Sequence, residues 1–377
     1  MSSFKSVKLI NGGNSIILKR HNGTCVRYHA TWLRDNALDS KTRDSRNGQR
    51  LISLSDIPVN TYIESATLDK KGKNIFLKFL PDMKQASFST NWLERNIYDV
   101  KRNNKKGWIS KKLKIWGSNM SKNIPTIDYK SAKSNKKLLV KWLKSIYCYG
   151  FAKMTGGKIK PGELIHIANL IGYIRETNYG KFFEVKSKIE ATNLAYTNLG
   201  LEPHTDNPYR DPVPTIQLLY CLENSASGGD STVVDGFNVA LRLKYKRPDY
   251  FNLLSRYCVH FEFKGDKNTH LKSRHPLIEL SSDGELMGIR FNNRSTAPIT
   301  DVPYNVMENY YKAYRLFANI VNDKTSAVNF KLNPGECFVV DNTRVLHART
   351  AYSGIGKRWL QGCYIDKDEL LSKISTM

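Results

Sequence analysis

The stretch LEPHTDNPYRDPVPTIQLLY, residues 201–220, places a histidine, an aspartate, an asparagine and a tyrosine just before a strand-like apolar run. In an extended segment residues i and i+2 point to the same face, so His204 and Asp206 can both reach one metal ion. A His-x-Asp pair alone is weak, because a chain with 8 histidines can contain one by chance in a polar turn. Sequence further along the chain decides between these two interpretations.

The C-terminal stretch NPGECFVVDNTRVLHARTAYSGIGKRWLQGCYID, residues 333–366, favours the metal site. A Pro-Gly turn leads into a strand-like run and then His347, and Arg358 opens another strand-like run eleven residues later. A second histidine completes a 2-His-1-carboxylate facial triad, which leaves positions on one side of Fe(II) open for a bidentate cosubstrate and O2. A planar guanidinium suits the far carboxylate of a dicarboxylate cosubstrate. Each element is common, but this ordered set is not.

The whole chain divides into three predicted parts. Residues 1–100 are expected to form a small β-rich domain, since short β-branched runs alternate with Asn-Gly and Gly-Gly turns. The lysine-rich residues 101–124 are expected to be a basic linker. Residues 125–377 begin with apolar residues at helical spacing and continue with many short strand-like runs. This pattern predicts an α+β, mainly β class with a barrel-like or jelly-roll core and flanking helices.

Charge and hydropathy narrow the function classes. Lysine and arginine outnumber aspartate and glutamate by 59 to 34, which gives a net charge of +25. Such a charge attracts polyanions, but lysine is spread along the whole chain without a zinc finger, RNP motif or basic heptad pattern, so nucleic-acid binding is not expected. The same field draws small anions toward a cleft. With neither a membrane-length apolar run nor a secretory signal, a soluble, cytoplasmic protein is expected.

The chain resembles the γ-butyrobetaine and trimethyllysine dioxygenase family, within the taurine-dioxygenase-like superfamily of Fe(II) and 2-oxoglutarate oxygenases. The resemblance extends over most of the chain and is carried by WLRDN (32–36), ETNYGKFFEV (176–185), residues 191–222, GGDSTVVDGF (228–237), RFNNRS (290–295) and FKLNPGECFVVDNTRVLHAR (330–349). It implies a double-stranded β-helix (jelly-roll) catalytic domain behind a small N-terminal domain. It also implies hydroxylation with Fe(II), 2-oxoglutarate and O2, ascorbate as reductant, and a homodimer.

The resemblance assigns roles to particular positions. The iron ligands, which are also the catalytic residues, correspond to His204, Asp206 and His347. The positions that bind 2-oxoglutarate correspond to Arg358, which meets the distal carboxylate, and to Asn193 and Leu219.

One departure from the family concerns a structural zinc. In many members a cysteine cluster follows WLRDN and binds zinc together with a later histidine. Here Ala37, Asp39 and Lys41 stand near the expected thiols, and Met83 stands near the expected histidine. Because thiolates and imidazoles make a tetrahedral zinc site, no structural zinc is expected. The N-terminal domain is expected to be held by its own packing.

The family also encloses a trimethylammonium group in an aromatic box, because ring faces attract a cation. By position the box corresponds to Tyr179, Phe183, Tyr196 and Tyr364. Core packing is the better explanation for any one tyrosine alone, but four aromatic residues at matching positions favour the box. A small trimethylammonium substrate is therefore expected.

The anionic end of the substrate is expected to meet Asn207, Tyr209, Asn292, Asn293 and Arg294. An amide, a phenol and a guanidinium offer more donors than a carboxylate needs, and a phosphonate uses more of them. HTDNPY together with FNNR is similar to the 2-(trimethylamino)ethylphosphonate hydroxylase branch, which hydroxylates the carbon next to phosphorus. That phosphonate is the first expectation, and γ-butyrobetaine, converted to L-carnitine, is the alternative.

Two other classes compete with a small-molecule oxygenase. A metal-free barrel that only binds its ligand is opposed by the complete triad and by Arg358. An oxygenase that modifies nucleic acid or protein, which the charge suggests, is opposed by the aromatic box and by the lack of an attached recognition module. The alternative interpretation of Arg294 is a surface arginine or the partner of a nearby acid.

Overall fold

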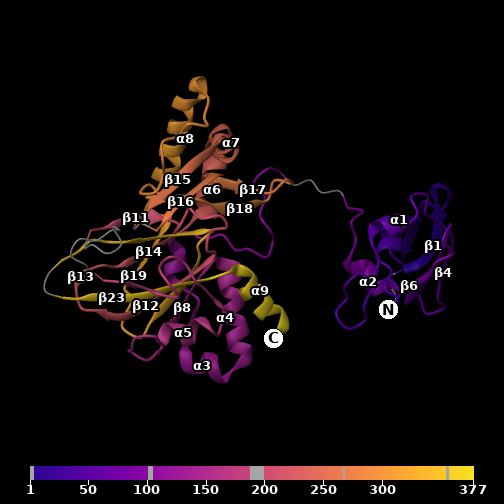
Figure 1. Cartoon of the computed structure of the whole chain (residues 1–377), viewed down its shortest axis with the longest axis horizontal. Coiled ribbons are helices and arrows are strands. Elements are labelled where there is room, and N and C mark those ends of the chain that lie inside the picture. The colour runs from indigo at the N-terminus through magenta and orange to yellow at the C-terminus, as the bar shows by residue number, and fades with distance from the viewer. Residues whose placement is uncertain (1–3, 101–104, 187–198, 266–267, 354–355) are drawn as a thin grey trace. The chain divides into compact units, whose positions relative to one another are not determined.

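The computed structural model describes residues 4–100, 105–186, 199–265, 268–353 and 356–377. The chain forms two compact units, Met1–Asn103 and Asn104–Met377 (Figure 1). Within the described ranges, no helix combines the length and the apolar character needed to cross a membrane.

The first unit consists of two antiparallel sheets, each of which runs directly into a short helix. The sheets have the strand orders β1 (Phe4–Ile10), β2 (Ser15–Arg20), β3 (Cys25–His29) and β4 (Tyr62–Leu68), β5 (Asn74–Leu80), β6 (Gln85–Ser89). The helices that follow them are α1 (Ala30–Asp35) and α2 (Thr90–Arg95). Alternate strand residues such as Ile16, Leu18, Ile75 and Leu77 share one hydrophobic cluster, as the period of two in a strand requires.

The positions that correspond to the family's zinc ligands have other contacts in the first unit. Ala37 is fully buried in the hydrophobic cluster. Asp39 accepts a hydrogen bond from Lys84 Nζ at 2.7 Å and another from the Thr42 hydroxyl. Met83 is 57% exposed. Packing and an ion pair therefore stabilise this part of the unit.

Residues 105–124 belong to the second unit, although the sequence predicts that they are part of a linker over residues 101–124. The Gly107 amide donates to the Gly284 carbonyl oxygen at 2.6 Å, and the Lys114 amide donates to the Cys148 carbonyl oxygen at 2.8 Å. Trp116 is buried in a cluster with Phe151. The lysine-rich composition gives no sign of these contacts, because Trp108 and Trp116, which attach the segment to the unit, lie between exposed lysines.

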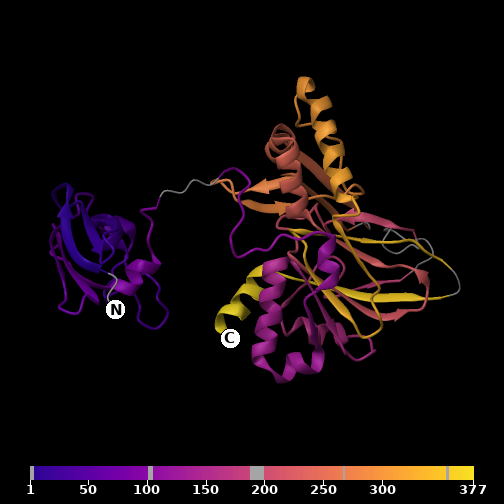
Figure 2. The same ribbon diagram turned by 180° about the vertical axis from the view of Figure 1, so that it is seen from behind.

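Two facing β-sheets form the centre of the second unit (Figures 1 and 2). The larger has the strand order β10 (Phe183–Val185), β23 (Arg358–Ile365), β12 (Ile216–Asn224), β20 (Cys337–Asp341), β8 (Phe151–Thr155), β7 (Thr126–Asp128), with β9 (Ile174–Arg175) beside β23. The smaller has the order β11 (Leu201–His204), β21 (Val345–Arg349), β14 (Ser231–Asp235), β19 (Ala327–Phe330). A separate ribbon pairs β13 (Ser227–Gly228) with β22 (Tyr352–Ser353). The facing sheets are consistent with the expected jelly-roll.

Alternation along β12 decides which side chains face the smaller sheet. Leu218 and Tyr220 pack with helices on the outer face. Leu219 and Cys221 join a cluster that includes Val233 of the smaller sheet. Because both faces are covered, nearly the whole strand is buried.

Helices cover the outer face of the larger sheet (Figure 2). They are α3 (Tyr129–Ser134), α4 (Lys136–Tyr149), α5 (Glu163–Ala168) and α9 (Lys367–Thr376). Leu139, Leu143 and Ile146 recur at helical spacing in α4 and bury one stripe against the sheet. Gly150, with a φ of 70°, ends α4 in the left-handed conformation and allows β8 to begin at the next residue.

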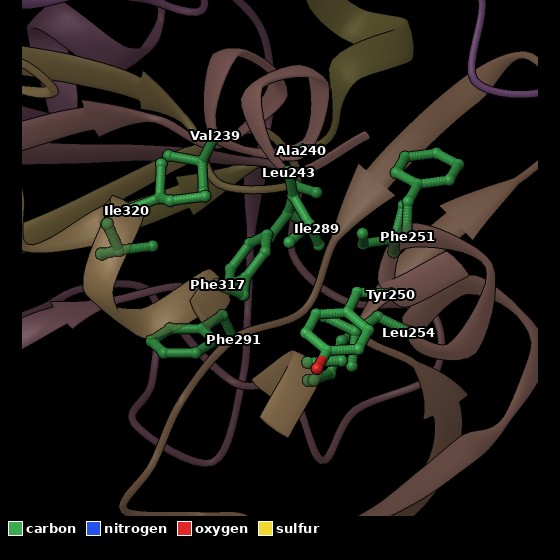
Figure 3. Packing of buried hydrophobic residues seen from close by; sticks show 14 of the residues in the cluster. Val239, Ala240, Leu243, Tyr250, Phe251, Leu254, Ile289, Phe291, Phe317 and Ile320 are labelled. Carbon is green, nitrogen blue, oxygen red and sulfur yellow. The ribbon is translucent and has the colours of Figure 1, made fainter. Parts of the chain in front are cut away.

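A mixed excursion separates β14 from β19. It contains α6 (Gly236–Lys246), α7 (Pro248–Arg256), β15 (Cys258–Lys264), β16 (His270–Pro276), β17 (Ile278–Leu280), β18 (Leu286–Ile289) and α8 (Tyr304–Val321). Figure 3 shows Leu243 of α6, Phe251 of α7 and Phe317 of α8 in one hydrophobic cluster with Ile289 of β18. The helices and strands of the excursion therefore pack around a hydrophobic cluster, which holds the loops beside it in place.

A buried ion pair joins the end of β14, where the excursion begins, to the turn between β20 and β21. Both Arg344 Nε and Nη2 lie 2.9 Å from the carboxylate oxygens of Asp235, and the two side chains are 1% and 0% exposed. Arg344 also donates to the carbonyl oxygens of Cys148 and Lys114, and Asp235 accepts from the Trp116 amide. Two desolvated charges thus satisfy one another and hold several chain segments together.

Candidate functional site

The two histidines of the predicted triad are neighbours across paired strands. His204 ends β11 and lies opposite His347 of β21 in the antiparallel register. Oδ1 of Asp206 lies 3.3 Å from His204 Nε2 and 3.7 Å from His347 Nε2. Cis donors on an octahedral ion with bonds of about 2.1 Å lie roughly 3 Å apart. The donor set and its spacing therefore fit one metal ion.

A hydrogen bond orients the His204 ring, and burial keeps the His347 ring neutral. His204 Nδ1 donates to the Glu202 carbonyl oxygen at 2.8 Å, which leaves the Nε2 lone pair facing Asp206. Burial, with smaller effects from His204 and Arg294, lowers the pKa of His347 to about 3, so this ring is neutral at physiological pH. Burial opposes ionisation of Asp206, but His347, His204 and Tyr364 hold the pKa of that carboxyl below its usual range.

The second carboxylate oxygen of Asp206 is held by two donors. Asp206 Oδ2 accepts hydrogen bonds from Gln217 Nε2 at 2.6 Å and from the Tyr364 hydroxyl at 2.8 Å. Burial, and then the neighbouring carboxylate, raises the pKa of Tyr364 well above its usual value, so the hydroxyl keeps its proton. Asn342 fixes the backbone, because its Oδ1 accepts from the Asp206 amide at 2.6 Å.

The triad lines a cavity of about 270 Å³ between the two sheets. Residues predicted for the site that line this cavity are Tyr179, Phe183, His204, Asp206, Asn207, Tyr209, Leu219, Asn292, Arg294, His347, Arg358 and Tyr364. Lining residues that sequence reasoning missed include Gln217, Ser231, Phe263, Phe338 and Arg349.

The remaining predicted residues lie elsewhere or outside the described part of the chain. Asn293 is exposed and is not part of the cavity lining, and its Oδ1 accepts a hydrogen bond from Tyr314. Asn292 lines the cavity, but its Nδ2 donates to the Thr205 carbonyl oxygen. Asn193 and Tyr196 lie outside the described residues.

Two buried arginines line the same cavity. Arg358 is 7% exposed, and its Nε donates to the Gly229 carbonyl oxygen at 3.2 Å. Burial and the neighbouring Arg349 lower the pKa of Arg358 to about 10, so it remains charged at neutral pH. Arg349 follows His347 by two residues and is itself buried. Two neighbouring buried guanidinium groups favour an anionic ligand.

Aromatic rings form another part of the cavity wall. The ring centroids of Phe183 lie 6.0 Å from Tyr179 and 5.3 Å from Tyr364. Tyr209 stacks on Phe263 with centroids 4.8 Å apart. Phe263 comes from β15 in the excursion, which contains none of the triad residues. Such a wall suits an apolar or cationic group.

The loop after Asp206 directs the amide of Asn207. Asn207 has a φ of 52°, a left-handed conformation that asparagine tolerates better than most residues. Its Oδ1 accepts from the Tyr209 hydroxyl at 2.8 Å, and the Tyr179 hydroxyl lies 3.2 Å from that of Tyr209. Asn207 Nδ2 is buried and has no hydrogen-bond partner among the described residues. The amide N–H groups are therefore available to a ligand in the cavity.

Arg290, which does not line the cavity, holds this loop through hydrogen bonds to its backbone. Its Nη1 donates to the carbonyl oxygens of Pro208 and Arg210, both at 2.9 Å, and its Nε lies 2.6 Å from Glu279 Oε1. Arg290 is 5% exposed. Sequence reasoning missed this role, although RFNNRS begins with Arg290.

The two facing sheets bring two histidines, one carboxylate and a buried arginine to one cavity. This is the arrangement found in Fe(II)- and 2-oxoglutarate-dependent dioxygenases. The chain belongs to the Taurine catabolism dioxygenase TauD, TfdA family, whose model matches residues 111–364. It is a 2-oxoglutarate-dependent dioxygenase, and dependence on Fe(II) is a property of this family.

Comparison with individual proteins identifies similar dioxygenases. The chain is 34% identical to the γ-butyrobetaine dioxygenase of Pongo abelii over 354 residues, which cover 92% of this chain and 90% of that protein. It is 30% identical to the mitochondrial trimethyllysine dioxygenase of Mus musculus over 356 residues, which cover 93% and 82%. PvcB from Pseudomonas aeruginosa, a solved structure, is similar with a TM-score of 0.49 and 15% identity over 70% of this chain and 95% of that chain.

Proposed function

We propose that the protein hydroxylates a C–H bond of a small trimethylammonium compound with an anionic tail, and that γ-butyrobetaine is the first candidate. The observation that carries this proposal is that one cavity contains the triad, an aromatic wall, and the donors Asn207 and Arg294. In the overall reaction, substrate, 2-oxoglutarate and O2 give the alcohol, succinate and CO2.

His204, Asp206 and His347 are the proposed iron ligands, and residues 105–377 are the proposed oxygenase domain. The metal, when bound, supplies the activation of O2. Arg358 is proposed to bind the distal carboxylate of 2-oxoglutarate, and Leu219 to line the same part of the cavity. The neighbouring charge of Arg349 strengthens this preference for an anion.

The aromatic wall is proposed to hold the trimethylammonium end. Such a group neither donates nor accepts hydrogen bonds, so ring faces are its natural partners. Tyr179, Phe183 and Tyr364 contribute adjoining rings, and Phe263 adds another from the excursion. The wall fixes which carbon of the substrate lies next to the triad, and this positioning is its contribution to catalysis.

The anionic tail distinguishes the two candidate substrates. The sequence puts the phosphonate first, because the amide of Asn207, the phenol of Tyr209 and the guanidinium of Arg294 offer more donors than a carboxylate needs. The Asn292 amide is occupied by a backbone carbonyl, the Tyr209 hydroxyl by Asn207, and Asn293 is not part of the cavity lining. The smaller number of available donors favours a carboxylate, and the resemblance to γ-butyrobetaine dioxygenase supports the same order. Arg294 keeps 2-(trimethylamino)ethylphosphonate as the second candidate.

The experiment that tests the proposal measures succinate formation with Fe(II), ascorbate, 2-oxoglutarate and a panel of compounds. The panel contains γ-butyrobetaine, 2-(trimethylamino)ethylphosphonate, trimethyllysine and taurine, which lacks the trimethylammonium group. We expect γ-butyrobetaine to stimulate turnover most and taurine not at all. If taurine stimulates turnover and no trimethylammonium compound does, the proposal is wrong. If the phosphonate exceeds γ-butyrobetaine, the order of the candidates is reversed.

Replacing Arg294 with alanine is expected to lower kcat/KM for γ-butyrobetaine about 10-fold, through loss of a charge-assisted contact to the anionic tail. The reduction is expected to be larger for the phosphonate, because its tail carries more charge. Arg315→Ala, which removes an exposed arginine of α8, is the matched control. Equal kcat/KM values for Arg294→Ala and Arg315→Ala with both substrates would exclude a contact between Arg294 and the tail.

Replacing Asn207 with aspartate is expected to lower kcat/KM for anionic trimethylammonium substrates by about 10-fold or more, because a carboxylate then faces the anionic tail. Aspartate tolerates the left-handed backbone at this position, so the loop keeps its shape. Steady-state kinetics with γ-butyrobetaine measure the effect, and the KM for 2-oxoglutarate serves as the internal control. An unchanged kcat/KM would show that the amide does not contact the substrate.

A further inference from the structure

The two carboxylate oxygens of Asp206 have different surroundings. Oδ1 faces the Nε2 atoms of His204 and His347 at 3.3 and 3.7 Å. Oδ2 accepts two hydrogen bonds, from Gln217 Nε2 at 2.6 Å and from the Tyr364 hydroxyl at 2.8 Å. The carboxylate therefore presents one oxygen to the metal site and has the other one occupied.

The strand register makes the two donors neighbours. Gln217 of β12 lies opposite Tyr364 of β23 in the antiparallel pairing, so both side chains leave the same face of the larger sheet at the same level. Both are buried, at 2% and 4% exposure. An ionised carboxylate only accepts hydrogen bonds, so the Gln217 amide must turn its Nε2 toward Asp206.

We infer that Gln217 and Tyr364 are positioning residues that hold Asp206 as a one-oxygen metal ligand. This inference rests on the proposed iron role of the triad. A carboxylate that bound through both oxygens would occupy an additional position on the ion, and that position is needed by a bidentate cosubstrate or by O2. Hydrogen bonds to the outer oxygen of a ligating carboxylate fix its orientation, and their loss usually weakens metal binding about 10- to 100-fold.

Tyr364 has a second contact that Gln217 lacks. Its ring centroid lies 5.3 Å from that of Phe183, within the aromatic wall proposed to hold the substrate cation. One side chain therefore touches the proposed substrate region with its ring and the carboxylate with its hydroxyl. This arrangement links the position of the substrate to the orientation of Asp206, whereas Gln217 acts on the carboxylate alone.

The test measures Mn(II) affinity of the full-length protein by electron paramagnetic resonance, without substrate or 2-oxoglutarate. Tyr364→Phe keeps the ring and removes the hydroxyl, and Gln217→Met keeps the length and removes the donor. Each is expected to raise the Kd for Mn(II) about 10-fold, and the double variant about 100-fold. Tyr179→Phe removes a hydroxyl from the same cavity that does not touch Asp206, so its Kd is expected to equal that of the unmodified protein.

The outcomes separate this inference from the proposals on which it rests. If the unmodified protein binds Mn(II) and both single variants bind it with the same Kd, the positioning inference is wrong while the iron proposal stands. If the unmodified protein binds no Mn(II), both fail. Thermal melting checks that Gln217→Met is folded, and if it is not, Tyr364→Phe alone decides. Because no substrate is present, an error in the proposed substrate does not affect the result.

A second readout concerns coupling. In Tyr364→Phe we expect more succinate per molecule of hydroxylated γ-butyrobetaine than in the unmodified protein, because the carboxylate loses its link to the aromatic wall. In Gln217→Met we expect weaker metal binding with a smaller change in this ratio. Identical ratios in Tyr364→Phe and the unmodified protein would remove the proposed link to the substrate.

Discussion

Replacing Asp206 with alanine is expected to reduce 2-oxoglutarate turnover to the level of a sample without protein. Asp206 supplies the carboxylate of the triad, and the two remaining imidazoles leave the ion with too few protein ligands. The loss of a ligand should exceed the about 10- to 100-fold weakening that follows the loss of a supporting hydrogen bond. Succinate formation and Mn(II) affinity, measured on the same preparation, check this expectation.

The matched control is Asp249→Ala. Asp249 lies on α7 and pairs with Arg247 at 2.6 Å on the surface, so its removal changes net charge by the same amount without touching the cavity. Its turnover is expected to equal that of the unmodified protein. Succinate production by Asp206→Ala at the rate of Asp249→Ala would exclude Asp206 as a required iron ligand.

Replacing Arg344 with methionine is expected to reduce the free energy of unfolding by about 3–5 kcal/mol. The substitution leaves the carboxylate of Asp235 buried without its counter-charge, and it removes the donors to the carbonyl oxygens of Cys148 and Lys114. A loss of this size is a large fraction of the total free energy of unfolding of an ordinary domain. Urea unfolding followed by circular dichroism measures the change.

A double-variant cycle shows how much of this loss comes from the stranded charge. Arg344→Met combined with Asp235→Leu removes both charges, and we expect it to be more stable than Arg344→Met alone. Arg247→Met breaks the exposed pair with Asp249 and is expected to cost less than about 1 kcal/mol. Equal losses for Arg344→Met and Arg247→Met would mean that burial of the first pair has no energetic consequence.

The chemistry of the triad could be predicted from the sequence because it depends on local spacing. His204 and Asp206 lie two residues apart at the end of a strand, and an apolar strand pattern precedes His347. Arg358 was found in the same way, because it opens a strand. Alternation along the strands explains why these side chains point inward once the sheets face one another.

The supporting residues could not be predicted in this way, because their roles depend on register between distant strands. Nothing in the local sequence of Gln217 distinguishes it from another buried strand residue until β12 is paired with β23. Phe263 comes from an excursion with its own core, and its place beside Tyr209 follows from how that excursion packs. The sequence predicts a basic linker over residues 101–124 because its lysines dominate the composition, and nothing in that composition indicates that Trp116 is buried.

The direct pairing of His204 with His347 also has a consequence for biosynthesis. During synthesis the N-terminus leaves the ribosome first, so β11 emerges long before β21. Strand β23, which contains Arg358 and Tyr364, emerges later still. A nascent or truncated chain that ends before β21 therefore contains two of the three triad residues, His204 and Asp206, and lacks Arg358, the proposed partner of the cosubstrate. On the proposed roles of these residues, a chain that ends before β21 is expected to turn over no 2-oxoglutarate.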